Sequence, residues 1–218
     1  MLIAMMAMLL MTALGVTLIL TSSSESLIAA HFLNSVEARY AADAIVERAM
    51  DDLVGAADWA VVIDGSTPSV WVDGAPAGVR TLADGSIVDL TQVVNLANCQ
   101  KTTTCSLADL NATTADRPWG ANNPRWKPYA YGALRDLIPA SHTIDSACYV
   151  VLLVGNGPPA VQGWEIIALR AEAFAPRGAH KVIEVTAGRA VGNPGEEKDY
   201  NDDPGQAGMK VLSWREVR

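Results

Sequence analysis

The chain begins with an apolar run, Met1 to Leu20, that carries no charge. Only Thr12, Gly15 and Thr17 interrupt its large apolar side chains and alanines. A helix of about 20 residues is about 30 Å long, which matches the hydrocarbon core of a bilayer. Because every face of this helix is apolar, it differs from the amphipathic helix of an ordinary globular domain. The run therefore predicts a segment that needs lipid or other helices around it.

A helical pattern continues beyond this run, and no proline occurs before Pro68. Apolar residues recur at spacings of three and four in two series, Leu33, Val36, Tyr40, Ala44 and Ala41, Ile45, Ala49, Leu53. Gly55 is a suitable C-terminal stop. The pattern predicts one continuous helix of about 50 residues, or about 75 Å, whose second half has one face to pack.

Residues 56–97 alternate short apolar runs with turn residues. The runs at 60–63, 70–72 and 87–90 lie next to Asp-Gly pairs at 64–65, 73–74 and 84–85. Asp-Gly between β-rich runs is typical of hairpin turns, so we expect short strands here. Residues 92–97 stay unassigned.

Residues 98–146 contain repeated prolines and predict an insert with little regular structure, apart from a helical turn at 133–138. The insert carries Trp119, Trp126, Tyr129 and Tyr131, and this aromatic content predicts a packed segment rather than a disordered one.

The C-terminal part has the clearest strand pattern. Strands are predicted at 149–154, 164–174, 181–187 and 209–217. Short turns between successive strands favour an antiparallel meander. A sheet and a striped helix each need a partner layer, so the second half of the helix should lie on this sheet. The expected fold class is α+β, with three parts: the apolar residues 1–24, the amphipathic residues 25–55, and a β-rich domain at 56–218.

Composition argues against two classes of function. The net charge of −8 opposes nucleic-acid binding, which needs a basic patch. The three histidines are far apart in the chain, and no nucleophile elbow, zinc-binding helix motif or glycine-rich phosphate loop is present. We therefore expect a chain without enzymatic activity.

The chain has three cysteines, an odd number. If the domain is exported, one disulfide is expected, and Cys99 with Cys105 is the first choice because the two enclose a short polar loop. Cys148 begins a very apolar run, which predicts a buried free thiol.

The N-terminal region resembles the type IV pilins and pseudopilins, and in particular the N-terminal region of PilX-type minor pilins. The resemblance rests on the apolar start, the residues Thr12 to Gly15, the serine-rich break before Glu25, and the alanine-rich and acidic segment 37–44. It covers about the first 55 residues well and extends weakly to the C-terminal strands. It implies that Met1 is the first residue of the mature chain, after removal of a short basic leader.

One position departs from the family pattern. Most type IV pilins carry a glutamate at the fifth mature position, where this chain has Met5. The first carboxylate, Glu25, lies about 30 Å further along the helix, too far to replace it. Because some minor and tip components also lack this glutamate, the choice between a major and a minor subunit stays open.

The resemblance implies a structural subunit that polymerises through its apolar helix with copies of itself or with other pilins. The chain would sit in the inner membrane before assembly and in an extracellular filament afterwards. The residues expected to pack in the filament core are Met1, Leu2, Ile3, Met5, Met6, Leu9, Leu10, Leu14, Gly15, Leu18 and Ile19. Gly15 and the polar residues 21–24 are weak helix formers, so any loosening of the helix in a filament is expected between residues 13 and 24.

Several polar features offer further sites, each with an alternative. The candidates for charged contacts between subunits are Glu25, Arg39, Asp43, Glu47 and Asp51. A solvated helix face explains Asp43, Glu47 and Asp51 equally, since like charges four residues apart slightly oppose each other.

The loop at 195–205 contains Asp199, Asn201 and Asp203, which alternate as oxygen ligands do in calcium loops. Pro204 stands where such loops have a glycine, and a solvated acidic turn is the alternative to a Ca²⁺ site. No other cofactor is expected. Asn111 lies in an Asn-x-Thr sequence and is a candidate for glycosylation.

Two other functions remain open. A single-span envelope protein could bind a partner through its β-domain. A minor or tip subunit could mediate adhesion through the aromatic residues of 116–131.

Overall fold

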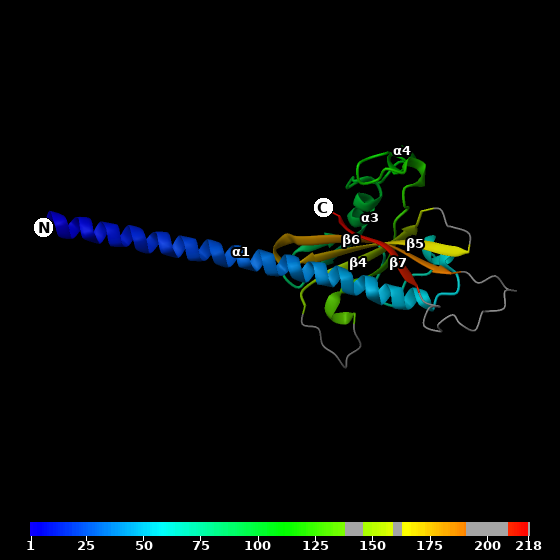
Figure 1. The fold of residues 1–218 in the computed structure, drawn as a ribbon, viewed down its shortest axis with the longest axis horizontal. Helices are drawn as coiled ribbons and strands as arrows, with labels where there is room; N and C mark the ends of the chain where they lie inside the picture. The colour runs from blue at the N-terminus through cyan, green and yellow to red at the C-terminus, as the bar shows by residue number, and fades with distance from the viewer. Residues whose placement is uncertain (138–145, 159–162, 191–208, 218) are drawn as a thin grey trace.

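The computed structural model describes residues 1–137, 146–158, 163–190 and 209–217. One long helix, α1 (Leu2–Val54), extends far beyond a body built on a five-stranded sheet (Figure 1). The helix has 53 residues and is capped by Gly55, where the sequence predicts its end. The predicted α+β fold, a long helix packed on an antiparallel sheet, is confirmed.

The sheet is an antiparallel meander whose strand order follows the chain. Its strands are β3 (Lys127–Ala133), β4 (Tyr149–Asn156), β5 (Trp164–Ala175), β6 (Ala179–Ala190) and β7 (Lys210–Val217). The last four are the strands that the sequence predicts. A single 3-10 turn, η3 (Pro176–Gly178), joins the two longest strands.

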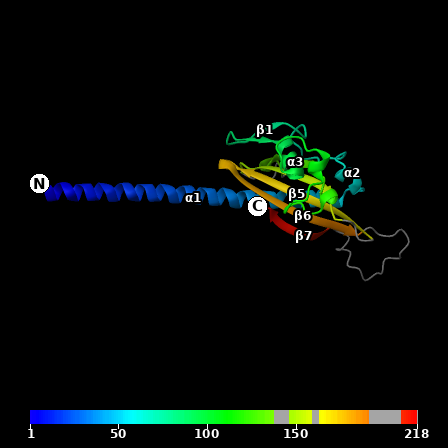
Figure 2. The same ribbon diagram turned by 90° about the horizontal axis from the view of Figure 1, so that it is seen from above.

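The second half of α1 lies along one face of this sheet (Figure 2). Its buried residues are mostly small: Ala38, Ala41, Ala42, Ile45, Val46, Ala49 and Leu53. They form one core with alternate residues of β5 and β6, among them Leu169 and Ile183. Alanine brings the helix backbone close to the strands, and Ile45 and Leu53 fill the remaining space. Contact begins at Asn34, whose Nδ2 donates to the carbonyl of Pro176 at 3.1 Å.

A separate layer covers part of the opposite face. It consists of a hairpin, β1 (Val79–Thr81) with β2 (Ile87–Asp89), and of α3 (Leu90–Cys99). Their apolar side chains, together with those of β4, form a second core of Leu82, Val88, Leu90, Val93, Ala97, Tyr149, Val151 and Leu153. Asn98 ties this layer to the insert, because its amide exchanges two bonds of 2.9 Å with the backbone of Trp126.

Two of the three predicted strands between the helix and the insert are wrong. Residues 60–63 belong to a helix, α2 (Trp59–Ile63), because Asp58 caps it by accepting from the N–H of Ala60 at 2.8 Å. Of residues 70–72, only Val72 forms a bridge, to Tyr131. The hairpin turn at 84–85 and the strand that follows are confirmed.

The insert has more regular structure than the sequence predicts. It contributes the edge strand β3, the short helix α4 (Leu107–Leu110) and the 3-10 turn η1 (Gly120–Asn122). The sequence does not predict β3 because it contains Pro128 and Gly132, two residue types that are rare inside strands. The pairing of β3 with β4 is irregular at Pro128. Gly132 leaves room for the ring of Trp71, which a Cβ at this position would approach to 3.1 Å. The predicted helical turn is present as η2 (Leu134–Asp136).

Candidate functional site

The first part of α1 exposes its apolar side chains. The predicted core-packing residues Met1, Leu2, Ile3, Met5, Met6, Leu9, Leu10, Leu14, Leu18 and Ile19 are between 62% and 106% exposed. Gly15 lies among them, and a Cβ there would meet nothing within 4 Å. The helix is long and apolar enough to cross a membrane, and its most apolar window has no buried residue. This part of the molecule lacks a partner within the described chain.

Apolar exposure continues well beyond Leu20. We call Ile28, Phe32, Leu33 and Tyr40 the distal apolar patch; these side chains are 65% to 69% exposed. At 3.6 residues per turn, Leu33 and Tyr40 lie on the side of the helix away from the sheet. Ile28 and Phe32 lie on the same side as Val46 and Met50, which pack on the core, and they are exposed because they precede the part of the helix that the body covers. From Met1 to Tyr40 the helix rises about 58 Å, nearly twice the thickness of a hydrocarbon core. A bilayer around Met1 to Leu20 would therefore leave the distal apolar patch in water.

Hydroxyl groups in the apolar stretch are satisfied by the helix itself. Thr12, Thr17, Thr21, Ser24 and Ser26 each donate to the carbonyl four residues earlier, at 2.8–3.0 Å. Such bonds let hydroxyl groups enter an apolar environment without an unpaired donor. The helix is continuous through residues 13–24 in this single chain, and the loosening expected in a filament stays a prediction.

The five candidates for charged contacts between subunits differ in what surrounds them. Glu25, Glu47 and Asp51 are exposed. Asp43 accepts from Nε1 of Trp214 on β7 at 3.3 Å, and the guanidinium of Arg39 lies over the same ring at 5.7 Å. Two of the five candidates thus already have a contact within the chain, and the other three project outward.

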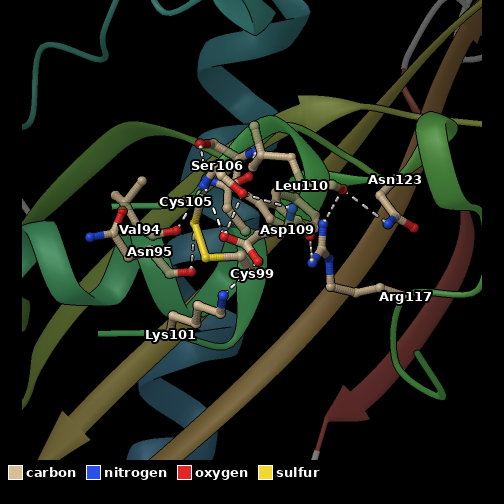
Figure 3. The surroundings of a disulfide bond; sticks show 12 residues. Val94, Asn95, Cys99, Lys101, Cys105, Ser106, Asp109, Leu110, Arg117 and Asn123 are labelled. Carbon is tan, nitrogen blue, oxygen red and sulfur yellow. Dashed lines mark hydrogen bonds and ion pairs between the residues drawn. A yellow bond between two sulfur atoms is a disulfide. The ribbon is translucent and has the colours of Figure 1, made fainter. Parts of the chain in front are cut away.

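The Cys99–Cys105 disulfide is present, as the sequence predicts, and it closes the end of α3 (Figure 3). Ser106 and Asp109 form a capping box on α4 just after it. The ammonium of Lys101 contacts the carboxylate of Asp109 at 2.5 Å and is the largest cause lowering the pKa of Asp109 to about 2, followed by the bonds from Ser106. Covalent and polar contacts, rather than a large apolar core, hold this loop.

Asn111 is partly buried at the end of α4. Its Oδ1 accepts from Nη2 of Arg125, whose Nη1 donates to the carbonyl of Leu110 at 2.7 Å. The side chain of the candidate glycosylation residue is thus engaged in the folded chain, and modification of Asn111 stays a prediction.

Cys148 is a free cysteine that is 1% exposed in the core under α1. Burial is the largest cause raising the pKa of its thiol to about 11. The thiol is therefore protonated near neutral pH. The predicted buried free thiol is confirmed.

The proposed calcium ligands Asp199, Asn201 and Asp203 lie outside the described residues, as does His142. Within the described ranges, no group of three or more metal-ligating side chains comes together. The Ca²⁺ site therefore stays a sequence-based prediction.

Comparisons with models of protein families, with curated proteins and with solved structures find no match to this chain. The long apolar helix beside an antiparallel sheet is compatible with a pilin-like fold.

Proposed function

We propose that this chain is a structural subunit of a type IV pilus-like filament or of a type II secretion pseudopilus. The observation that carries the proposal is the length over which α1 exposes apolar side chains. Met1 to Leu20 could be covered by lipid, but Phe32, Leu33 and Tyr40 lie beyond the reach of the same bilayer. Packing against neighbouring helices would cover both stretches at once.

Assembly would exchange one apolar environment for another. Before assembly, the run from Met1 to Leu20 sits in the inner membrane and the body lies outside the cytoplasm. During assembly, the apolar helices leave the lipid and pack against those of other copies or of other pilins. Helix contact in lipid depends on close packing, while removal of the distal apolar patch from water adds a hydrophobic contribution. No catalytic step is needed in this role.

A single-span envelope protein is the competing function, and it makes a different demand on the distal apolar patch. A lone membrane anchor gains nothing from Phe32 and Leu33 standing exposed above the bilayer. The patch therefore separates the two functions experimentally.

The test compares a double variant, Phe32→Ser with Leu33→Ser, with the control Ile87→Ser. Ile87 is 68% exposed on the β1–β2 hairpin, in the layer on the opposite side of the sheet from α1. The full chain would be purified in detergent, the detergent removed, and the products analysed by crosslinking and electron microscopy. We expect multimers or fibres for the wild type and the control, and their loss in the double variant. Equal multimers in all three samples, or a wild type that stays monomeric in lipid even when other pilins are added, would contradict the proposal.

A further inference from the structure

A groove of about 670 Å³ lies on the outer face of the sheet, opposite α1. The layer of α3 and the β1–β2 hairpin packs over β4 and leaves the outer face of β6 and β7 open. The floor of the groove is formed by alternate residues of β5, β6 and β7, including Arg170, Glu184 and Arg215. One wall comes from the insert, with Trp119 at its edge. The volume falls in the range of roughly 300–1,000 Å³ that is typical of small-molecule sites.

The floor carries arginines whose carboxylate partner is fully engaged. Glu184 accepts from Nη1 of Arg170 at 2.7 Å and from Nε of Arg215 at 2.9 Å. Glu172, which is 3% exposed, accepts from Nε of Arg170 at 2.8 Å. Bonds to other described residues use Nε and Nη1 of Arg170 and Nε and Nη2 of Arg215. Within the described chain, the remaining terminal nitrogen of each guanidinium is left as a donor, held in a fixed position.

The wall adds an aromatic surface and a further positive charge. Trp119 is 50% exposed, and the guanidinium of Arg215 lies 6.0 Å from its ring centroid. Arg117 is 6% exposed and donates to the carbonyl of Leu110 at 2.6 Å. Among the described residues it forms no salt bridge, and burial, the larger cause, together with nearby Arg125 lowers its pKa. The wall therefore holds a buried cation without a carboxylate partner in the described chain.

Hydroxyl groups complete the lining. Thr186 and Ser213 face each other across β6 and β7, and both line the groove. The lining thus combines fixed guanidinium donors, hydroxyl groups that can donate or accept, and one exposed indole face. Two carboxylates also line the groove: Glu184 is bonded to both arginines of the floor, and Asp116 accepts from Nε2 of Gln100 at 2.9 Å. A matching ligand must be rich in hydrogen-bond acceptors and must offer a flat face of C–H groups.

We propose that the groove binds an acidic saccharide. The negative face of the Trp119 ring would contact the polarised C–H groups of a sugar ring. The free guanidinium nitrogens of Arg170 and Arg215 would donate to the sugar carboxylate, since charge-assisted bonds of this kind are the strongest available there. Thr186 and Ser213 would bond the hydroxyls. This site does not depend on a filament, so its test is independent of the test of the proposed assembly role.

The test titrates the full chain in detergent with trigalacturonate and with the uncharged galactotriose, using calorimetry. We expect trigalacturonate to bind at least tenfold more tightly than galactotriose. Trp119→Ala and Arg215→Gln should each weaken trigalacturonate binding about tenfold or more. Trp214→Ala is the matched control, because this tryptophan is 45% exposed on the same strand as Arg215 but faces α1, and it should change binding less than twofold.

Three outcomes would overturn the proposal. Neither saccharide produces heat at millimolar concentration, or Trp214→Ala weakens binding as much as Trp119→Ala does, or an acidic peptide such as hexaglutamate binds while trigalacturonate does not. The last result would assign the groove to a protein partner. Unfolding midpoints of all variants should be measured alongside, and Arg215→Gln serves as the second variant if Trp119→Ala does not fold.

Discussion

The two faces of the sheet are covered in different ways. On one face, α1 supplies a continuous apolar surface in which Ala42, Ile45 and Leu53 are fully buried. On the other face, a layer made of short elements covers only part of the sheet. It packs on β4 through a second, smaller apolar core and is also held by a disulfide, a capping box and arginine–carbonyl bonds. Burial of apolar area makes the helix face strong and uniform. The other face has a smaller apolar core, and the part of the sheet that this layer leaves uncovered holds the groove.

One face of the sheet is thus packed under α1, and the other has room to bind a ligand. A ligand site needs exposed polar groups, which a fully covered face cannot offer. The larger of the two apolar cores lies under the helix, while the open face carries Arg170, Arg215 and Trp119. Substitutions on the two faces should therefore change the free energy of unfolding by different amounts and affect different parts of the chain.

The largest effect is expected for Ile45→Asp on the helix face. Ile45 is 0% exposed, so the variant buries a carboxylate without a partner and should lower the free energy of unfolding by more than about 4 kcal/mol. The control Glu47→Ala changes an exposed residue of the same helix and should stay within about 0.5 kcal/mol. Urea denaturation followed by tryptophan fluorescence measures both. Similar midpoints for the two variants would show that α1 does not stabilise the body.

An intermediate effect is expected in the layer opposite α1 when its disulfide is removed. Replacing Cys99 and Cys105 by serine removes a crosslink between residues six positions apart in the chain. Loop-closure entropy predicts that the free energy of unfolding falls by roughly 2 kcal/mol. Hydrogen exchange should accelerate in α3 and the insert and stay unchanged in residues 38–53 of α1. The control Thr103→Ser lies in the same loop and should alter neither. Faster exchange under α1 would mean that the two faces are not independent.

The smallest effect is expected from titration of Asp109. Because its pKa is lowered from 3.8 to about 2, its ionised form stabilises the capping box fully above pH 3.8. That contribution is lost as the pH falls through about 2. Amide signals of Ser106 and Asp109 in NMR spectra should shift with a midpoint near 2, and Asp109→Asn should abolish this transition. A midpoint near the ordinary value would contradict the contact with Lys101.

Some candidate sites could be predicted from the sequence, and others depend on the tertiary structure. The exposed apolar residues of α1 and the Cys99–Cys105 pair are visible in the sequence, since each depends on neighbours in the chain. The groove is not visible, because Arg170, Glu184 and Arg215 are far apart in the chain and meet only through the register of β5, β6 and β7. The sequence already indicates two of its lining residues, Trp119 and Trp126, through the aromatic content of the insert.

Local patterns by themselves determined the long helix and four strands of the meander, because a period of 3.6 or 2 records which side chains a regular backbone presents to one side. Tertiary structure decided the conformation of segments whose pattern is weak or fits both a helix and a strand. Residues 60–63 are as apolar as a strand but form a helix once Asp58 caps them, and β3 pairs with β4 despite Pro128. Pairing and burial bring distant residues together, and no local period encodes which strand lies beside which.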